Sequence, residues 1–333
     1  MLHRFGFNIL ASICDGASEN RNFINASVQL HPNFPNSPHI GLNPFTNGPI
    51  YFISDPPHLI KKLRNNIFSS GHQDFHKRTI TLHGKEIIWD HFVSVFSRES
   101  KRTLPVTKLN TDAIYLNNFS KMRVNLAVNT LSENVAVEME ENENEVTKST
   151  QEYIKYCSSL FNILNSQTPF IDDNDPRLKQ LININQWFYD WETEIEHALI
   201  MPSEIQKCSL SWQTIQDVHL TISSFVDLIK YTNSAEFKEK YPSATYIIPK
   251  RLNQDIVESW FSFQRGCCRD GREPTVLQYG YNSTKLLSVK RAKCDIANTS
   301  YGNATIQEVV EANDNLKITK PCKKRKLTWP LDL

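Results

Sequence analysis

The stretch Phe7-Asn-Ile-Leu-Ala-Ser-Ile-Cys14-Asp15-Gly16 is an apolar run that ends in a carboxylate and a glycine. Residues 7–14 predict a buried β-strand, and Asp15 stands at its end. A carboxylate in that position can bind a divalent cation through its oxygens. An Asp-Gly pair after a strand is also typical of a simple turn. The stretch therefore predicts either a metal ligand or a turn residue at Asp15.

A second acidic cluster lies far along the chain, in Asn253-Gln-Asp255-Ile-Val-Glu258-Ser-Trp-Phe. The pattern predicts a helix that places Asp255 and Glu258 one turn apart on the same face. Two Mg²⁺ ions held by carboxylates can activate an attacking oxygen and stabilise a leaving one. We therefore expect Asp15 and Glu258 to converge as catalytic metal ligands, roughly 4 to 8 Å apart. The alternatives are a solvated Glu258 and an exposed Asp255 favoured by the helix dipole.

A third motif, Asp55-Pro-Pro-His58, predicts the start of a helix over residues 58–68. Asp55 is a suitable N-cap, and proline suits the first helical turn. The alternative for Asp55-Pro-Pro-His58 is a role near the active site or DNA. The helix carries three cations, which are candidates for contacts to DNA phosphate: Lys61, Lys62 and Arg64. The alternative for this cluster is a solvated helix face.

The hydrophobic pattern divides the chain into four regions of an α/β plus α protein. Residues 1–70 predict strands and helices, and residues 71–235 predict a helical block. Residues 236–285 carry the acidic helix. Residues 286–333 lose periodicity, which predicts a flexible tail.

The elements of the first two regions follow from shorter signals. In the first, a helix is expected around residues 27–30, a loop rich in Pro and Asn over residues 31–49, and a short strand over residues 50–53. In the helical block, one apolar face is predicted from Val124, Leu126, Leu131, Val135 and Val137.

Composition points to local rather than overall charge as the guide to partners. The 333 residues include 37 Lys and Arg against 36 Asp and Glu, for a net charge of +1, so a nucleic-acid surface must be local. The seven cysteines form no Cys-x-x-Cys pair, which argues against a disulfide framework or a zinc site. No apolar run has the length of a membrane span, and no Gly-x-x-x-x-Gly-Lys-Ser/Thr phosphate loop is present.

Three further patterns have simple structural interpretations. The acidic run Glu138–Glu145 predicts an exposed loop or helix end. Residues Lys323–Lys326 match a nuclear-import patch, with a plain basic tail as the alternative. Five aromatic residues with apolar neighbours are expected in the core, with base stacking as the alternative: Trp187, Trp191, Trp212, Trp260 and Phe261.

Several blocks together resemble the P-element-type DNA transposases, a family that includes the THAP domain-containing protein 9 group. The blocks occur in the family's order and span about residues 5–285. They are Cys-Asp-Gly-Ala-Ser-Glu-Asn-Arg at 14–21 and the segments at residues 51–65, 119–136, 160–166 and 252–258.

The resemblance implies a partial RNase H-like fold interrupted by a large helical insertion that binds GTP. It implies DNA cleavage and strand transfer with Mg²⁺, for which Asp15 and Glu258 are the expected ligands. Lys121 lies in a well-matching insertion segment and is the expected contact to GTP phosphate, with Asp255 beside the metal or the nucleotide. The implied partners are transposon ends and target DNA, and the implied setting is a homo-oligomer in the nucleus.

The resemblance also implies parts that have no counterpart here. The family uses three carboxylates, the first on the opening strand of the sheet, after an amino-terminal zinc-coordinating module and a dimerising segment. We therefore expect an amino-terminally truncated transposase that is inactive alone, whose sheet exposes an edge and an apolar face. The alternative is a non-catalytic, transposase-derived protein that binds nucleotide or partners.

Overall fold

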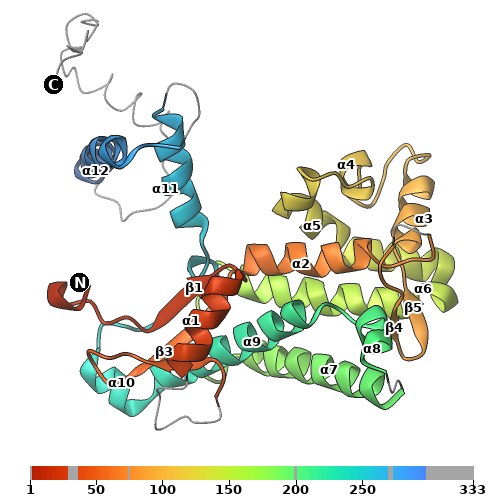
Figure 1. The fold of residues 1–333 in the computed structure, drawn as a ribbon, viewed down its shortest axis with the longest axis horizontal. Helices are drawn as coiled ribbons and strands as arrows, with labels where there is room; N and C mark the ends of the chain where they lie inside the picture. The colour runs from red at the N-terminus through yellow and green to blue at the C-terminus, as the bar shows by residue number, and fades with distance from the viewer. Residues whose placement is uncertain (1, 29–36, 74–75, 199–200, 269–272, 298–333) are drawn as a thin grey trace, which may run out of the picture. The chain divides into compact units, whose positions relative to one another are not determined.

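The computed structural model describes residues 2–28, 37–73, 76–198, 201–268 and 273–297, and it is mostly helical (Figure 1). The chain forms two compact units, Met1–Gln254 and Asp255–Leu333. The first unit contains a small sheet surrounded by helices. No helix within these ranges is long and apolar enough to cross a membrane.

A three-stranded sheet in the first unit has the order β1-β3-β2. It consists of β1 (Ala11–Cys14), β2 (Ile40–Leu42) and β3 (Pro49–Ser54). β1 is parallel to β3, with Cys14 opposite Ser54, and β2 is antiparallel to β3. Because the two parallel strands end at the same edge, Asp15 and Asp55 follow neighbouring strand ends. The strand predicted over residues 50–53 is confirmed as β3.

The strand predicted over residues 7–14 is wrong in its length and its burial. Its pairing with β3 covers Ala11–Cys14, which are half-buried, and Phe7 is 61% exposed. β2 lies in the predicted loop, because three residues are too few to show a strand period. The helix expected around residues 27–30 overlaps only the end of α1 (Ser18–Val28), which begins soon after the Asp15-Gly16 turn, and residues 29 and 30 lie outside the described residues.

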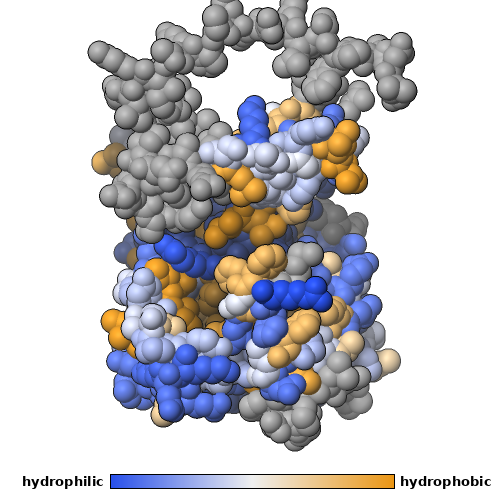
Figure 2. Space-filling view, turned by 90° about the vertical axis from the view of Figure 1, so that its left-hand side faces the viewer, coloured by the Kyte–Doolittle hydropathy of each residue, from blue (hydrophilic) through white to orange (hydrophobic). Residues whose placement is uncertain are grey.

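Exposed apolar side chains lie in the segments that flank the strands of this sheet. In the described part of the chain β1 is an edge strand. Nearby large apolar residues stay at the surface: Phe5, Phe7, Phe23 and Phe45. Figure 2 shows apolar patches between polar ones on the side of the molecule that faces left in Figure 1. The edge position of β1 agrees with the expected exposed edge, while the exposed apolar residues lie outside the strands, so the apolar face of the sheet stays a prediction.

Helix α2 (Pro56–Phe68) confirms the helix expected after the Asp55 motif. The two prolines occupy its first turn, and the Asp55 carboxylate accepts a hydrogen bond from the His58 N–H at 3.0 Å. Its apolar side chains are buried against the body of the unit: Leu59, Ile60, Leu63 and Ile67. The local capping signal thus placed this helix correctly.

A β-hairpin, β4 (Ile80–Leu82) and β5 (Lys85–Ile87), interrupts the region predicted to be helical. Its two-residue turn holds His83 at φ 53° and Gly84 at φ 67°. Two-residue hairpin turns whose backbone twist matches that of the flanking strands have positive φ at both turn positions. His-Gly is a weak turn signal beside Asn-Gly, and the strands are three residues long, so the pattern concealed the hairpin.

The helical part of the first unit packs into one core with α2 and the hairpin. Its core includes Trp187 and Trp191, as predicted, and Leu126, Leu131 and Val135 of the predicted apolar face, while Val137 is 44% exposed. The elements are α3 (Asp90–Glu99), α4 (Thr111–Ile114), α5 (Val124–Thr130), α6 (Glu133–Leu164), α7 (Pro176–Ala198), α8 (Pro202–Cys208), α9 (Trp212–Asn233) and α10 (Ala235–Lys240). Short 3₁₀ turns occur at Leu2–Phe5 (η1), Ser120–Met122 (η2) and Pro249–Arg251 (η3).

Helix α9 joins the sheet to the helical block. It packs along β3, where the Thr221 hydroxyl accepts a hydrogen bond from the Ser54 N–H at 3.1 Å. The sequence led us to expect that the helical block of residues 71–235, which separates the two acidic segments, would stand apart from the sheet. The packing of α9 on β3 shows that this expectation is wrong. Thr221 and Ser224 are fully buried, and their small side chains let the helix approach the strand closely.

The acidic run Glu138–Glu145 is not an exposed loop or helix end but part of the long helix α6. Glu138 is 1% exposed and accepts a hydrogen bond from Arg102 Nη1 at 2.7 Å. Arg102 also donates to Glu99 at 2.6 Å, so one guanidinium joins two buried carboxylates. The charge of the run concealed that this one position faces the interior.

The second unit contains α11 (Asp255–Gly266) and α12 (Val276–Ala297) in its described part. Trp260 Nε1 donates to the Tyr279 hydroxyl at 2.9 Å, and Gln264 Nε2 donates to Ser283 Oγ at 2.9 Å. α12 continues past residue 286, where the tail was expected to begin. The predicted import patch Lys323–Lys326 lies outside the described residues.

Candidate functional site

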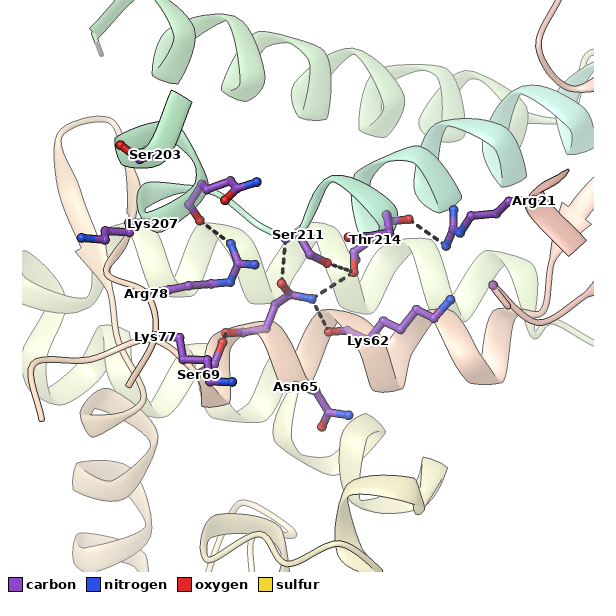
Figure 3. Close-up of a pocket in the computed structure, with 14 residues that line it drawn as sticks. Arg21, Lys62, Asn65, Ser69, Lys77, Arg78, Ser203, Lys207, Ser211 and Thr214 are labelled. Carbon is purple, nitrogen blue, oxygen red and sulfur yellow. Dashed lines mark hydrogen bonds between the residues drawn. The ribbon is translucent and has the colours of Figure 1, made fainter. Parts of the chain in front are cut away.

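A groove in the first unit brings five cationic side chains together at one place (Figure 3). Its volume is about 740 Å³. We call it the basic groove, and it is lined by Gly16, Arg21, Lys62, Asn65, Asn66, Ser69, Lys77, Arg78, Ser203, Gln206, Lys207, Ser211, Gln213 and Thr214. Five of these side chains are cationic, and the others carry hydroxyl or amide groups apart from Gly16.

Six parts of the fold supply this lining. Gly16 follows β1, and Arg21 lies on α1. The helix α2 contributes Lys62 and three neutral polar residues, while Lys77 and Arg78 precede β4. The opposite wall comes from α8 and from the first turn of α9. The groove is therefore a product of packing between segments that are distant in sequence.

A buried carboxylate, Asp217 on α9, holds two of the cations. Its Oδ2 lies 2.8 Å from Arg21 Nη2 and 2.7 Å from Lys62 Nζ, and Asp217 is 3% exposed. Arg21 also donates to the side-chain oxygen of Gln216 at 3.1 Å. One carboxylate thus fixes two cations at the groove surface and neutralises only one charge of the pair.

Gly16 lies directly against this ion triad. A Cβ atom at residue 16 would come within 2.0 Å of Lys62 Nζ, 2.6 Å of Arg21 Nη2 and 2.7 Å of Asp217 Oδ2. A larger residue would therefore displace the charged groups. The glycine of the Asp15-Gly16 motif has a steric role that joins the end of β1 to the groove.

Further hydrogen bonds join the two walls of the groove. Asn66 accepts from the Ser211 N–H at 2.8 Å and donates to Thr214 Oγ1 at 3.0 Å, which ties α2 to the start of α9 (Figure 3). Arg78 Nη1 donates to the carbonyl oxygens of Gln206 and, at 3.0 Å, Ser209. Burial lowers the pKa of the Arg78 guanidinium below its usual range. These bonds position the groove before any ligand arrives.

The charges of the groove favour a polyanion. The lining has five cationic side chains, and the buried carboxylate of Asp217 pairs with two of them, Arg21 and Lys62. The amino-terminal turn of the 22-residue helix α9 also faces the groove through Ser211, Gln213 and Thr214. The positive end of a helix dipole adds to the attraction for anions. The site is chemically suited to binding phosphate groups rather than to proton transfer.

Asp15 lies next to the groove and makes the hydrogen bonds of a turn. Its Oδ1 accepts from Asn20 Nδ2 at 2.7 Å and from the Ala17 N–H at 3.2 Å. The described residues contain no group of three His, Cys, Asp or Glu side chains able to hold a metal ion. Asp15 is half-buried, and its role as a metal ligand stays a prediction. Glu258 and Asp255 lie exposed in the first turn of α11, in the second unit, so their convergence with Asp15 stays a prediction.

The last residue of the first unit, Gln254, is anchored at the ends of β1 and β3. Its N–H donates to Asp55 Oδ1 at 2.7 Å, and its side-chain amide donates to the Ile13 carbonyl at 3.5 Å. Burial raises the pKa of Asp55, but hydrogen bonds from the His58 side chain and the Gln254 and His58 N–H groups outweigh it and leave that pKa below its usual value. Gln254 thus lies at the ends of β1 and β3, immediately before the segment of the chain that carries Asp255 and Glu258.

The three cations predicted on α2 have different positions. Lys62 lines the basic groove, and Lys61 is half-buried on the same helix. Arg64 is fully buried, its Nη2 donates to the Lys121 carbonyl at 2.9 Å, and burial lowers its pKa to about 10. Arg64 is thus removed from the phosphate-binding surface predicted for it, because it lies on the interior face of the helix.

Lys121 lies in η2 and is half-buried. Its ammonium is 4.8 Å from the centre of the Phe68 ring, a cation–π contact. Its carbonyl is the one that accepts from Arg64, so buried contacts hold its backbone in place. Lys121 is therefore positioned and partly accessible, as a phosphate contact requires.

Sequence reasoning missed most of the groove and misplaced two aromatic residues. Arg21 is the last residue of the block at residues 14–21. No pattern in the sequence marked Lys77, Arg78, Lys207 or Asp217, because these residues lie in separate segments of the chain. Trp212 and Phe261, which were expected in the core, are 58% and 47% exposed. Trp212 begins α9 outside its packed face, and the Arg21 guanidinium is 5.8 Å from its ring.

Comparison with known proteins relates the chain to one group. Residues 57–175 match the family model described as TNP-like, GTP-binding insertion domain. The Transposable element P transposase of Drosophila melanogaster is 28% identical over 247 residues, which is 72% of this chain and 30% of that protein. The solved Drosophila P element transposase strand transfer complex has a chain with TM-score 0.65 and 25% identity, and the match covers 86% of this chain and 61% of that one. This chain thus spans less than a third of the length of the curated relative.

Proposed function

This chain is related to P-element-type transposases by sequence and by fold, and from that premise we propose that it binds a guanine nucleotide and acts on transposon DNA. The match of residues 57–175 to a GTP-binding insertion domain is the observation that carries the nucleotide part. The similarity to a strand transfer complex supports DNA as the partner.

For the nucleotide, the proposed phosphate contact is Lys121. The matched segment begins in α2 and includes the hairpin and α3 to α6, and Lys121 lies within it on η2. Buried contacts of Arg64 and Asn65 to the Lys121 carbonyl brace the backbone there. A lysine held in this way can make a charge-assisted contact to phosphate without losing much backbone freedom. Asp255 is proposed beside the nucleotide.

For DNA, we propose that Asp15 and Glu258 are metal ligands in an RNase H-like arrangement. Two observations within the first unit support this: Asp15 ends a strand parallel to β3, and Gln254 is hydrogen-bonded at the same sheet edge four residues before Glu258. Bound Mg²⁺ would supply activation of the attacking oxygen and stabilisation of the leaving one. Action in the nucleus, and in a homo-oligomer, belongs to the same proposal.

The nucleotide proposal is tested by titrating fluorescent GTP against the wild-type chain, Lys121→Ala and Lys148→Ala. Lys148 is an exposed lysine on α6 within the same matched segment, so it controls for loss of one positive charge. We expect Lys121→Ala to weaken binding roughly ten- to a hundredfold, as for a lost charged hydrogen bond, and Lys148→Ala to bind like wild type. Equal binding by all three proteins contradicts the role of Lys121.

The alternative is a non-catalytic protein that keeps nucleotide or partner binding. The turn hydrogen bonds at Asp15 favour it, since they give that carboxylate a structural role. Nicking assays with terminal-repeat DNA and Mg²⁺ separate the two functions. We expect the 333-residue chain to be inactive alone, because two carboxylates do not hold two metal ions in line. Robust nicking that Asp15→Ala abolishes would contradict this and support catalysis.

A further inference from the structure

We infer that the basic groove binds the phosphate backbone of duplex DNA and leads it to the end of β1. The inference rests on the proposed function for its choice of DNA as the polyanion. Its own support is the lining of the groove, which presents Arg21, Lys62, Lys77, Arg78 and Lys207 around one cavity. The whole chain has a net charge of only +1, so this grouping is a local feature of the fold.

The spacing of polar residues along α2 fits successive phosphates. Lys62, Asn65, Asn66 and Ser69 all line the groove, and their spacing of three, one and three residues places them on one face of α2 and its C-cap over two turns. At about 1.5 Å per residue, the strip from Lys62 to Ser69 is about 10 Å long. One strand of B-form DNA advances about 3.4 Å per phosphate along the axis, so the strip spans about three phosphates.

The neutral part of the lining also favours a backbone over bases. Among the described residues that line the groove none is aromatic, and Ser, Thr, Asn and Gln side chains stand between the cations. Single-strand sites use aromatic platforms to stack bases, whereas contacts from hydroxyl, amide and cationic groups go mainly to phosphate. The groove therefore contacts the phosphate groups on the outside of a duplex.

The groove is organised before DNA binds. Asp217 holds Arg21 and Lys62, and Asn66 and Arg78 join the two walls by hydrogen bonds. Gly16, the neighbour of Asp15, lines the groove beside Lys62 and Arg21. A duplex that follows the lining reaches the strand end that carries the candidate catalytic carboxylate. Gly16 thus belongs to the DNA-binding groove and is the residue next to the candidate catalytic Asp15 in the chain.

The test replaces Lys77 and Lys207, two lysines at the rim of the groove whose side chains do not hold other parts of the fold in place. Lys77 and Lys207 are exposed, and the bonds shown for them use their backbone atoms. The double variant Lys77→Gln/Lys207→Gln is compared with Lys238→Gln/Lys240→Gln on α10, which packs at the other end of α9. Binding of a labelled 30-base-pair duplex of arbitrary sequence is measured by anisotropy from about 50 to 200 mM KCl, with thermal melting as the folding control.

We expect the rim variant to weaken duplex binding roughly ten- to a hundredfold at about 0.1 M salt and to reduce the salt slope by about 2. The α10 control should keep the wild-type slope, and both variants should bind GTP like wild type. Unchanged binding by a folded rim variant overturns the inference, as does equal weakening by the α10 control. Tighter binding of single-stranded DNA, or no binding of duplex by the wild type, also overturns it, while the GTP titration independently decides the nucleotide proposal.

Discussion

Gly16 shows how one missing side chain shapes the groove. A Cβ atom there would overlap Lys62 Nζ, Arg21 Nη2 and the Asp217 carboxylate. The turn at Asp15 therefore brings the strand end against the ion triad without a gap. In a single sequence this glycine is indistinguishable from an ordinary turn glycine.

We expect Gly16→Ala to displace Lys62 or Arg21 from Asp217 and to destabilise the fold by about 1–3 kcal/mol, since Asp217 is buried. Duplex binding should weaken with it. The matched control is Gly280→Ala in α12, where a Cβ meets nothing within 4 Å and alanine favours the helix. Urea denaturation measures both variants. A Gly16→Ala protein as stable as wild type would show that the triad adjusts freely.

Asp55 combines three tasks in one buried carboxylate. It caps α2, accepts from His58, and anchors Gln254 at the sheet edge. We expect Asp55→Ala to cost about 2–4 kcal/mol, from a lost cap and an unpaired Gln254 N–H. Asp173→Ala, an exposed carboxylate, should change stability little. Denaturant unfolding at pH 7 checks both.

The pH dependence of the Asp55 effect follows from its lowered pKa. A carboxyl group with a lower pKa in the folded state binds fewer protons than in the unfolded chain, where the pKa is about 3.9. Its contribution to stability is therefore complete above that value and disappears as pH falls through the folded-state pKa. The stability difference between wild type and Asp55→Ala should shrink below about pH 4. A difference that grows on acidification would contradict this sign.

At the scale of the elements, the acidic composition of α6 misleads about which of its residues are buried. In its acidic run Glu140, Glu141 and Glu145 are exposed, whereas Glu138 is buried, pairs with Arg102 and lies 3.6 Å from Arg98 Nε. Arg102 also pairs with Glu99, whose pKa stays below its usual range because hydrogen bonds from Thr107 and Arg102 outweigh the effect of burial. The network connects α3 to α6 through charges that face inward.

We expect Glu138→Gln to lower the melting temperature clearly more than Glu141→Gln. The first change weakens a buried ion pair to Arg102, while Glu141 is exposed on the same helix. Thermal melts followed by circular dichroism at about neutral pH measure the two shifts. Equal shifts would mean that the buried network adds nothing beyond surface charge.

At the scale of the whole first unit, α9 holds the sheet, the helical core and the groove together. It packs on β3 and α7, its first turn lines the groove, and its Asp217 sets the ion triad. Polar side chains at the contact with β3 are buried and hydrogen-bonded to the strand, which fixes the helix relative to the sheet.

Thr221→Val tests this connection with little change in shape. The hydroxyl is lost, so the buried Ser54 N–H loses its acceptor, and we expect a cost of about 1–3 kcal/mol. Thr193→Val on the exposed side of α7 is the matched control and should change stability by less than about 0.5 kcal/mol. Chemical denaturation decides between them, and a neutral Thr221→Val would show that packing alone positions α9.

Local signals in the sequence determined several parts of this protein. The Asp55-Pro-Pro cap and the apolar spacing predicted α2, the short apolar run predicted β3, and the ordered blocks pointed to the P-element-type transposases. Such signals succeed because a cap, a turn or a helical period depends on residues within one or two turns of chain.

Only the tertiary structure decided which side chains meet and which face inward. Arg64 and Glu138 are buried while Trp212 is exposed, each against the expectation from its own neighbourhood. The basic groove draws its cations from α1, α2, the segment before β4, and α8, and no spacing within one segment records their meeting. Burial and charge clustering depend on how elements pack, and packing is set by long-range contacts that a linear pattern does not contain.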